Sequence, residues 1–418
     1  MPLPLQRTGD VLALKASLPS ADWCVVDLDA GSGEYLKSTH TLLTIFVECA
    51  RLIESALRSL LYRQKLQNKS KVIKVTNCGL PCNPTLRPYP NFNANSDVEL
   101  LKKAMDGMGT DEAMIIEILG TRTSQQRVEI AEAYKGSYGE DLREKLQGEL
   151  SGDFGELVDL MFYTIPELKA QLCYDAINGA GTDELALIEV ICTSTNSEIE
   201  ELKKEYAKVC QNHGKAANEN SLEKDVVGDT SGYFKRILVA LLAAQRHEPT
   251  EQQLKDIANR GIDSIIDKKA AEADAQKLYD AGEKRLGTDE EAFITILCTR
   301  SPWQLIAISK AYEKISKLRL VEAIASETKG DFRRALLTTL LANTNTPMAF
   351  AEHFNDGLSG AGTNDDQLMR LIVWRSEVDM KEIKNCYLTR YNRDLVDDIK
   401  DDTSGDYEKL LVRLLGSQ

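Results

Sequence analysis

The string Gly107-Met108-Gly109-Thr110-Asp111-Glu112 is the first of four closely related strings in this 418-residue chain. The others are Gly179-Ala180-Gly181-Thr182-Asp183-Glu184, Arg285-Leu286-Gly287-Thr288-Asp289-Glu290 and Gly360-Ala361-Gly362-Thr363-Asn364-Asp365. Twelve residues after each Thr, the chain has Arg122, Ser194, Arg300 or Arg375. One such string would be weak evidence, but recurrence at a regular period is the signature of stacked supersecondary repeats.

Each string is followed at a distance by an acidic residue, then by Gly three residues later and by an aromatic residue two further on. The sets are Glu149/Gly152/Phe154, Asp229/Gly232/Phe234, Glu327/Gly330/Phe332 and Asp402/Gly405/Tyr407. The Thr-to-acid distance is 39 residues in the first, third and fourth copies, and 47 in the second. The extra residues of the second copy lie near the polar stretch 210–220. The sequence therefore predicts four homologous repeats, with an insertion in the second.

Between these markers the apolar residues follow a helical period, as in the segment from Met114 to Leu119. Acidic residues fill the first turn after each string, which favours a capped helix start there. The predicted N-caps are Thr110, Thr182, Thr288 and Thr363. Strand patterns are nearly absent, so we predict an all-α fold in which stacked repeats of about 70 residues bury a shared core.

The spacing of the repeats sets the predicted domain boundaries. The Thr-to-Thr intervals are 72, 106 and 75 residues, so a long break separates repeats two and three. The capping-box pattern Thr250-Glu251-Gln252-Gln253 predicts a helix within this break, kinked or divided at Gly261. The predicted segments are an N-terminal extension (1–95), repeat one (96–166), repeat two (167–246), a linker (247–270), repeat three (271–345) and repeat four (346–418).

The charge of the chain limits its partners. The formal net charge is −14, although residues 1–95 carry 11 basic and 7 acidic residues, so the body is still more acidic. An acidic body argues against nucleic-acid binding and against direct docking on an anionic membrane. An anionic partner would need a bridging cation. The nine Cys include no C-x-x-C pair, which favours reduced thiols in a cytosolic protein over a disulfide framework.

The loop Met105 to Thr110, taken with Glu149, has the chemistry of a calcium site. Glycine lets the loop turn its carbonyls inward, and a distal carboxylate can add two oxygens. Calcium takes roughly 6–8 oxygen ligands in irregular geometry, whereas magnesium demands a near-ideal octahedron. Water or a lipid phosphate oxygen would complete the shell. The alternative is a simple helix–helix turn with a solvated acid, but a turn needs no partner far along the chain, and the acid recurs in all four copies.

From about Asn95 to the C-terminus, these strings resemble the annexin family. Val227-Gly228-Asp229-Thr230-Ser231-Gly232-Tyr233 and Ala281-Gly282-Glu283-Lys284 resemble family signatures of repeats two and three. The resemblance implies four repeats of about five helices each, forming a curved disc. It also implies that the convex face of the disc binds Ca²⁺ and then an anionic phospholipid such as phosphatidylserine.

By position, the resemblance implies one ligand set for each repeat, made of three backbone carbonyls and one carboxylate. The sets are Met105, Gly107, Gly109 and Glu149; Ile177, Gly179, Gly181 and Asp229; Gly282, Arg285, Gly287 and Glu327; and Leu358, Gly360, Gly362 and Asp402.

The chain departs from the family pattern in its loops. The family often has Lys or Arg between the first two carbonyl donors, where this chain has Asp106, Asn178 and Ser359. In repeat three the loop is basic, with Lys284 and Arg285. Met108 and Leu286 occupy loop tips, where they either enter the membrane interface or pack locally.

No P-loop, G-x-S-x-G, H-E-x-x-H or EF-hand loop is present, so we predict no enzymatic activity. Trp303 and Trp374 are predicted to lie in the core. Two interpretations of residues 1–95 stay open: a tail, with a helix over Leu42–Leu61, that docks a protein partner or a membrane, or an extension without order. The stretch Pro81–Pro90 is predicted to be an extended linker into the core.

The function predicted from the sequence is calcium-dependent binding to anionic membranes. The alternative is a helical-repeat scaffold that binds proteins and has weakened calcium loops. We expect a cytoplasmic protein that becomes a peripheral membrane protein when calcium rises. Oligomers on membranes and a cell-surface or non-classically secreted pool are compatible with this prediction.

Overall fold

The computed structural model describes residues 6–8, 11–13, 25–27, 79–80, 82–107, 109–179, 181–215, 221–360 and 362–417. The chain divides into two units, Met1–Ala56 and Leu57–Gln418. In the first unit, three short strands that the sequence analysis did not predict form an antiparallel sheet with β2 in the middle. They are β1 (Gln6–Thr8), β2 (Val11–Ala13) and β3 (Val25–Asp27). The helix predicted over residues 42–61 lies outside the described residues.

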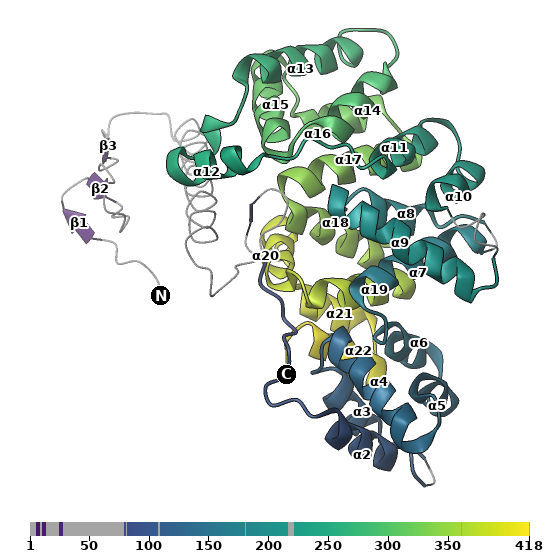
Figure 1. Ribbon diagram of the computed structural model, residues 1–418. Helices are drawn as coiled ribbons and strands as arrows, with labels where there is room; N and C mark the ends of the chain where they lie inside the picture. The colour runs from purple at the N-terminus through teal and green to yellow at the C-terminus, as the bar shows by residue number, and fades with distance from the viewer. Residues whose placement is uncertain are drawn as a thin grey trace. The chain divides into compact units, whose positions relative to one another are not determined.

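The described part of the second unit is built from helices in groups of five, one group to each repeat (Figure 1). Repeat one has α2 (Ala94–Ala104), α3 (Glu112–Leu119), α4 (Ser124–Tyr138), α5 (Leu142–Glu149) and α6 (Gly152–Leu160). Repeat two has α7 (Ile165–Asn178), α8 (Glu184–Ile191), α9 (Asn196–Asn212), α10 (Leu222–Asp229) and α11 (Gly232–Leu242).

Repeats three and four follow the same order. Repeat three has α13 (Lys268–Ala281), α14 (Glu290–Thr299), α15 (Pro302–Ile315), α16 (Leu320–Glu327) and α17 (Gly330–Thr344). Repeat four has α18 (Thr346–Leu358), α19 (Asp365–Ser376), α20 (Met380–Tyr391), α21 (Leu395–Asp402) and α22 (Gly405–Leu414). The all-α prediction is therefore confirmed for the repeats. Among the described helices, none is both long and apolar enough to cross a bilayer.

The N-caps predicted from the sequence are wrong by one residue. The second helix of each repeat is capped by the residue after the Thr, whose side-chain oxygen accepts a hydrogen bond from a backbone N–H three residues further on. These caps are Asp111, Asp183, Asp289 and Asn364. Asp and Asn rank at least as high as Thr among N-cap residues, so they take this role. The Thr hydroxyls are left to make a different contact.

The linker contains the predicted helix, α12 (Glu251–Arg260), followed by the short 3₁₀ helix η2 (Ile262–Ser264). Thr250 and Gln253 form the predicted capping box. Gly261 has a φ of 82°, which favours glycine and ends α12. Ile257 packs on buried Trp303, and this contact attaches the linker to repeat three. Trp303 and Trp374 are both buried, as predicted.

Repeat one packs against repeat four, and repeat two packs against repeat three. Helix α22 contacts α3 and α6, and α19 also contacts α6. On the other side, α11 contacts α14 and α17, and α8 contacts α17. The first and last repeats of the sequence are therefore neighbours in space.

A buried polar pair of repeat one is replaced by different residues in repeat two. In repeat one, the Arg122 guanidinium donates to Asp97 through Nε (2.7 Å) and Nη2 (2.8 Å). In repeat two, Lys169 and Ser194 take these positions, and Lys169 Nζ donates to Ser194 Oγ at 2.7 Å. The ammonium also lies 5.0 Å from the centre of the Trp374 ring. In repeat two the buried cation is therefore Lys169, on the first helix of the repeat. In repeat one it is Arg122, which follows the second helix.

A buried ionic cluster joins repeats two and four. Glu189 on α8 is 1% exposed and accepts hydrogen bonds from Arg370 Nε and Gln367 Nε2 on α19, both at 2.5 Å. Arg370 Nη1 lies 3.2 Å from Asp183 Oδ2. Burial raises the pKa of Glu189, whereas the charge of Arg370 opposes that rise. The carboxylate therefore depends on Arg370 for its charged state.

The segment before α2 lies along repeats four and one. Asn83 donates its backbone N–H to Glu382 Oε2 (2.9 Å), and Leu86 is buried. The guanidinium of Arg122 lies 3.6 Å from the centre of the Tyr89 ring. The predicted extended linker is present, and it is held by contacts with both repeats.

Replacing Arg370 with Met should lower the free energy of unfolding by about 3–5 kcal/mol, because Glu189 would stay buried without its cation. Chemical denaturation followed by circular dichroism measures this change. The control is Lys409→Met, which breaks an exposed ion pair with Asp406 and should leave the stability close to that of the parent. Adding Glu189→Gln to Arg370→Met should recover part of the loss. An Arg370→Met protein as stable as the parent would contradict this account of the cluster.

Candidate metal sites

Each of the four loops closes onto the helix before it through the same backbone hydrogen bond. The residue after the Thr donates its N–H to a carbonyl at or near the end of the first helix of the repeat. The pairs are Asp111 to Ala104 (2.9 Å), Asp183 to Ala176 (2.9 Å), Asp289 to Ala281 (2.8 Å) and Asn364 to Gly357 (2.9 Å). This bond pins both ends of the loop, so the residues between them form a tight bend.

The glycine before the Thr has a positive φ in all four loops. The angles are 96° for Gly109, 104° for Gly181, 81° for Gly287 and 122° for Gly362. Residues with a Cβ rarely adopt this conformation, so the bend requires glycine. The recurrence of Gly-Thr in the sequence therefore has a backbone cause in each repeat.

The Thr hydroxyl joins the loop to the distal acid. It donates to the carboxylate in Thr110–Glu149 (3.1 Å), Thr182–Asp229 (2.7 Å) and Thr288–Glu327 (3.0 Å). The insertion in repeat two does not change this contact, although it lengthens the chain between the partners to 47 residues. The acids that sequence spacing singled out in these three repeats therefore lie at their loops.

In repeat three the Glu327 side chain packs closely on Gly282, at the start of the loop. A β-carbon at Gly282 would lie 3.1 Å from Cγ of Glu327. The Gly282 carbonyl accepts a hydrogen bond from the N–H of Arg285 at 2.9 Å. Among the described residues, it is the one predicted carbonyl ligand that already accepts a hydrogen bond. A carbonyl oxygen has two lone pairs, so this one can accept the hydrogen bond and still bind another partner.

The acids of repeats one and four line one shared cavity of about 440 Å³. Glu149 and Asp402 border it together with Asp153, Asp365 and Asp406. Burial raises the pKa of Asp365, and the negative charges of Asp153 and Asp402 add to that rise. Carboxylates from two repeats are therefore close enough to repel one another, and a bound cation would relieve this repulsion.

The surroundings of the first loop include a residue whose role the sequence did not reveal. Lys145 Nζ lies 3.4 Å from Glu149 Oε1, so this lysine competes with a metal ion for the carboxylate. Exposed ion pairs of this kind contribute little stability, so the competition is weak. At the tip of the third loop, the Leu286 side chain is fully exposed. Met108, at the tip of the first, lies outside the described residues.

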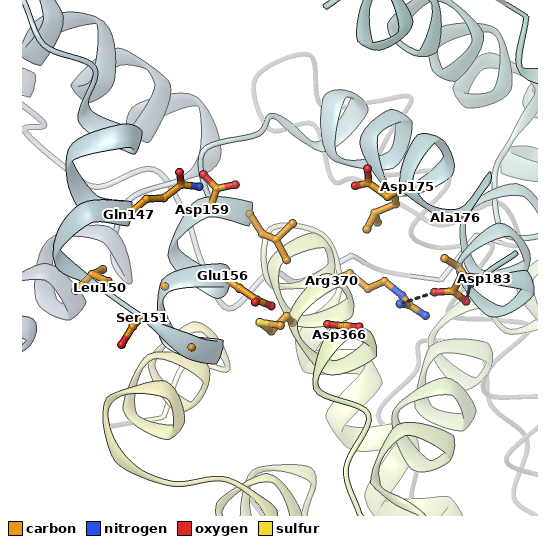
Figure 2. A pocket seen from close by; sticks show the side chains of 16 residues that line it. Gln147, Leu150, Ser151, Glu156, Asp159, Asp175, Ala176, Asp183, Asp366 and Arg370 are labelled. Carbon is orange, nitrogen blue, oxygen red and sulfur yellow. Dashed lines mark hydrogen bonds and ion pairs between the residues drawn. The ribbon is translucent and has the colours of Figure 1, made fainter. Parts of the chain in front are cut away.

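A second cavity, of about 540 Å³, lies between α6, α7 and α19. Figure 2 shows Arg370 beside Asp366, with its guanidinium directed at Asp183. Burial also raises the pKa of Asp175, which lines the cavity. None of the predicted ligands borders this cavity, so its charges belong to the junction between repeats and not to the loops.

The donors that the loops offer fit a hard cation. Carboxylate and carbonyl oxygens are the ligands that calcium prefers. Within the described part of the chain, no group of three or more His, Cys, Asp or Glu side chains is arranged to hold a metal ion. An ion held at a loop would therefore depend on backbone carbonyls as well as on one carboxylate. This pattern suits calcium, which tolerates few charged ligands and irregular geometry.

Comparisons with known proteins agree with this architecture. The annexin family model matches residues 96–160, 169–241, 273–339 and 349–414. Annexin A13 of Schistosoma japonicum is 43% identical over 80% of this chain and 95% of its own length, and annexin A8 of Oryctolagus cuniculus is 41% identical over the same shares. The crystal structure of calcium-bound annexin (Sm)1 superposes with a TM-score of 0.71 at 36% identity, covering 85% of this chain and 99% of that one. The chain belongs to the annexin family.

Proposed function

We propose that this protein binds anionic phospholipid membranes in a calcium-dependent manner and that each repeat holds Ca²⁺ through its predicted carbonyls and acid. The observation that carries the proposal is the Thr-to-acid contact. It is present in three of the repeats, between residues that are 39 or 47 positions apart in the sequence. Annexins are known for calcium-dependent phospholipid binding, which supports the same conclusion. The role proposed is binding and not catalysis.

The charge of the chain explains why calcium would be required. At a net charge of −14, the protein is repelled by an anionic surface. Calcium at the loops neutralises the carboxylates and keeps part of its coordination shell open, because one acid and a few carbonyls do not supply all of its roughly 6–8 ligands. A lipid phosphate oxygen can fill the open position. Removal of calcium restores the repulsion, so attachment is reversible.

The loop of repeat three has the features of a membrane contact. Lys284 and Arg285 are basic, and the adjacent Leu286 is a large apolar side chain held entirely in solvent. Exposed large apolar residues cost free energy unless a partner covers them, and a bilayer interface is one such partner. We therefore assign Leu286 to the membrane interface.

The finer features of the function stand as proposals. The preferred headgroup is phosphatidylserine-like, and the protein is peripheral to membranes when calcium rises. A protein partner for residues 1–95 and oligomerisation on the membrane are separate proposals that the repeats neither require nor oppose.

The protein should sediment with phosphatidylserine-containing vesicles in calcium and return to the supernatant when a chelator is added. Vesicles of phosphatidylcholine alone are the control, because they lack net negative charge. Sedimentation that is equal in calcium and in chelator would refute calcium-gated binding. It would favour the alternative scaffold, in which the loops have lost their ions.

The double substitution Glu149→Gln with Glu327→Gln should raise the calcium concentration needed for half-maximal vesicle binding by about tenfold or more. Each lost contact to a charged group is worth about 1.5–3 kcal/mol. The matched control is Glu132→Gln with Glu272→Gln, which removes two exposed glutamates on α4 and α13. If both double variants have the calcium dependence of the parent, Glu149 and Glu327 are not ligands.

The substitution Leu286→Trp should place a fluorophore at the membrane. Its emission should shift to the blue when vesicles and calcium are added, and brominated lipids should quench it. Leu388→Trp is the control, because Leu388 is also an exposed leucine but lies on α20, away from the loops. An equal response from the two positions, or none from Leu286→Trp, would contradict the assignment.

A further inference from the structure

The insertion in repeat two brings a cation to the loop of that repeat. Lys215 follows α9, and its Nζ lies 2.8 Å from Asn178 Oδ1. Asn178 stands between Ile177 and Gly179, two of the carbonyl ligands predicted for repeat two. The ammonium is therefore beside the loop, although 37 residues separate Lys215 from Asn178 in the sequence.

Several contacts fix the position of Lys215. Its backbone N–H donates to the Cys210 carbonyl at 2.9 Å, closing a turn that Gly214 allows with a φ of 78°. The ammonium lies 5.0 Å from the centre of the Tyr174 ring and 3.5 Å from Asp225 Oδ2. Lysine side chains lose much rotational freedom when they are held. Here the neighbours hold the amine before any ligand arrives.

Repeat four shows what the same connection does without an insertion. Arg393 occupies the link between α20 and α21, and it also lies near a tyrosine ring and an aspartate. Its Nη2 donates to Asn355 Oδ1 at 3.0 Å. Asn355 lies within α18, about one turn before the loop. In repeat two, the cation that follows the third helix instead reaches Asn178, at the loop itself.

Repeats one and three differ in the partner of their loop cation. Lys102 pairs with Asp106 and Lys284 pairs with Asp280, both at 2.8 Å, so a carboxylate neutralises each ammonium at close range. The nearest partner of Lys215 is a neutral amide, and its carboxylate neighbour is more distant. Lys215 has three N–H donors, of which Asn178 takes one and Asp225, at 3.5 Å, takes a second. The ammonium therefore retains both charge and a donor for an anionic oxygen.

We propose that Lys215 contacts the phosphate of a membrane lipid at the loop of repeat two. The assignment rests on the proposed function and names a side chain that acts beside the calcium ion. The side chain of Lys215 is 27% exposed, so part of it is open to a ligand. A phosphate that bridges to calcium through one oxygen would accept a hydrogen bond from the ammonium through another.

The test compares vesicle binding of the parent with that of Lys215→Gln at saturating calcium. The variant should bind phosphatidylserine vesicles about fivefold more weakly, the effect expected of one basic residue near an anionic surface. Lys215→Arg should restore binding. The matched control Lys208→Gln removes an exposed lysine that pairs with Glu205 on α9, and it should bind as the parent does.

Two further measurements separate a lipid contact from other roles. Calcium titration without vesicles should give the same affinity for the parent and for Lys215→Gln, because a phosphate contact needs the lipid. A lower calcium affinity in the variant would show that Lys215 only positions the loop, and this would overturn the proposal. Glycerol 3-phosphate should not displace the parent selectively; if it releases the parent but not Lys215→Gln, the site takes free phosphate, and the lipid assignment fails.

The failures of the two proposals are distinguishable. If the parent does not sediment in calcium, calcium-gated binding fails, and the role of Lys215 fails with it. If the parent sediments in calcium and Lys215→Gln binds equally well, only the role of Lys215 is overturned.

Discussion

The contact between a loop threonine and an acid 39 or 47 residues further on is the constraint on which three of the four loops depend. It joins the start of the second helix of a repeat to the end of the fourth. The closing backbone bond pins the loop to the first helix, and the left-handed glycine allows the bend. Three helices of the repeat therefore meet at one short segment. These bonds form within the chain itself, so a bound ion does not have to supply all of the order of the segment.

The arrangement of charge links the loops to the packing of the repeats. Repeat one meets repeat four so that acids of both border one cavity, and the negative charges there are held together by folding. In the core, by contrast, Glu189 is matched by Arg370. The protein thus compensates its buried charge internally and leaves its loop charge to be compensated by a cation. Under the proposed function, this difference would make the loops, and not the buried cluster, responsive to calcium.

Much of the fold could be predicted from the sequence, because the same pattern of residues occurs in four copies. The helices, the linker helix and the buried tryptophans follow from periodicity and capping patterns. The N-caps were misassigned because Thr and Asp are adjacent and both cap well, and propensity alone does not decide between them. Once Asp111 caps the helix, Thr110 is available to the distal acid.

Other features depend on contacts that no local pattern shows. Glu189 and Arg370 are 181 residues apart, and nothing near either of them indicates the other. The replacement of Asp97 and Arg122 by Lys169 and Ser194 can be recognised in the sequence, since the two residues of each pair are 25 positions apart. A comparison of the repeats at that offset would find it. The proximity of Lys215 to Asn178 is a contact across 37 residues, which spacing does not define.

A crystal structure determined in calcium, with anomalous data to identify the ions, tests the central claim most directly. The account predicts ions at the loops, with carbonyl oxygens and the carboxylates of Glu149, Asp229, Glu327 and Asp402 at about 2.3–2.6 Å. The carboxylates would turn from the threonine hydroxyls toward the metal. Loops without ions in saturating calcium, or ions bound at sites that exclude these four acids, would contradict it.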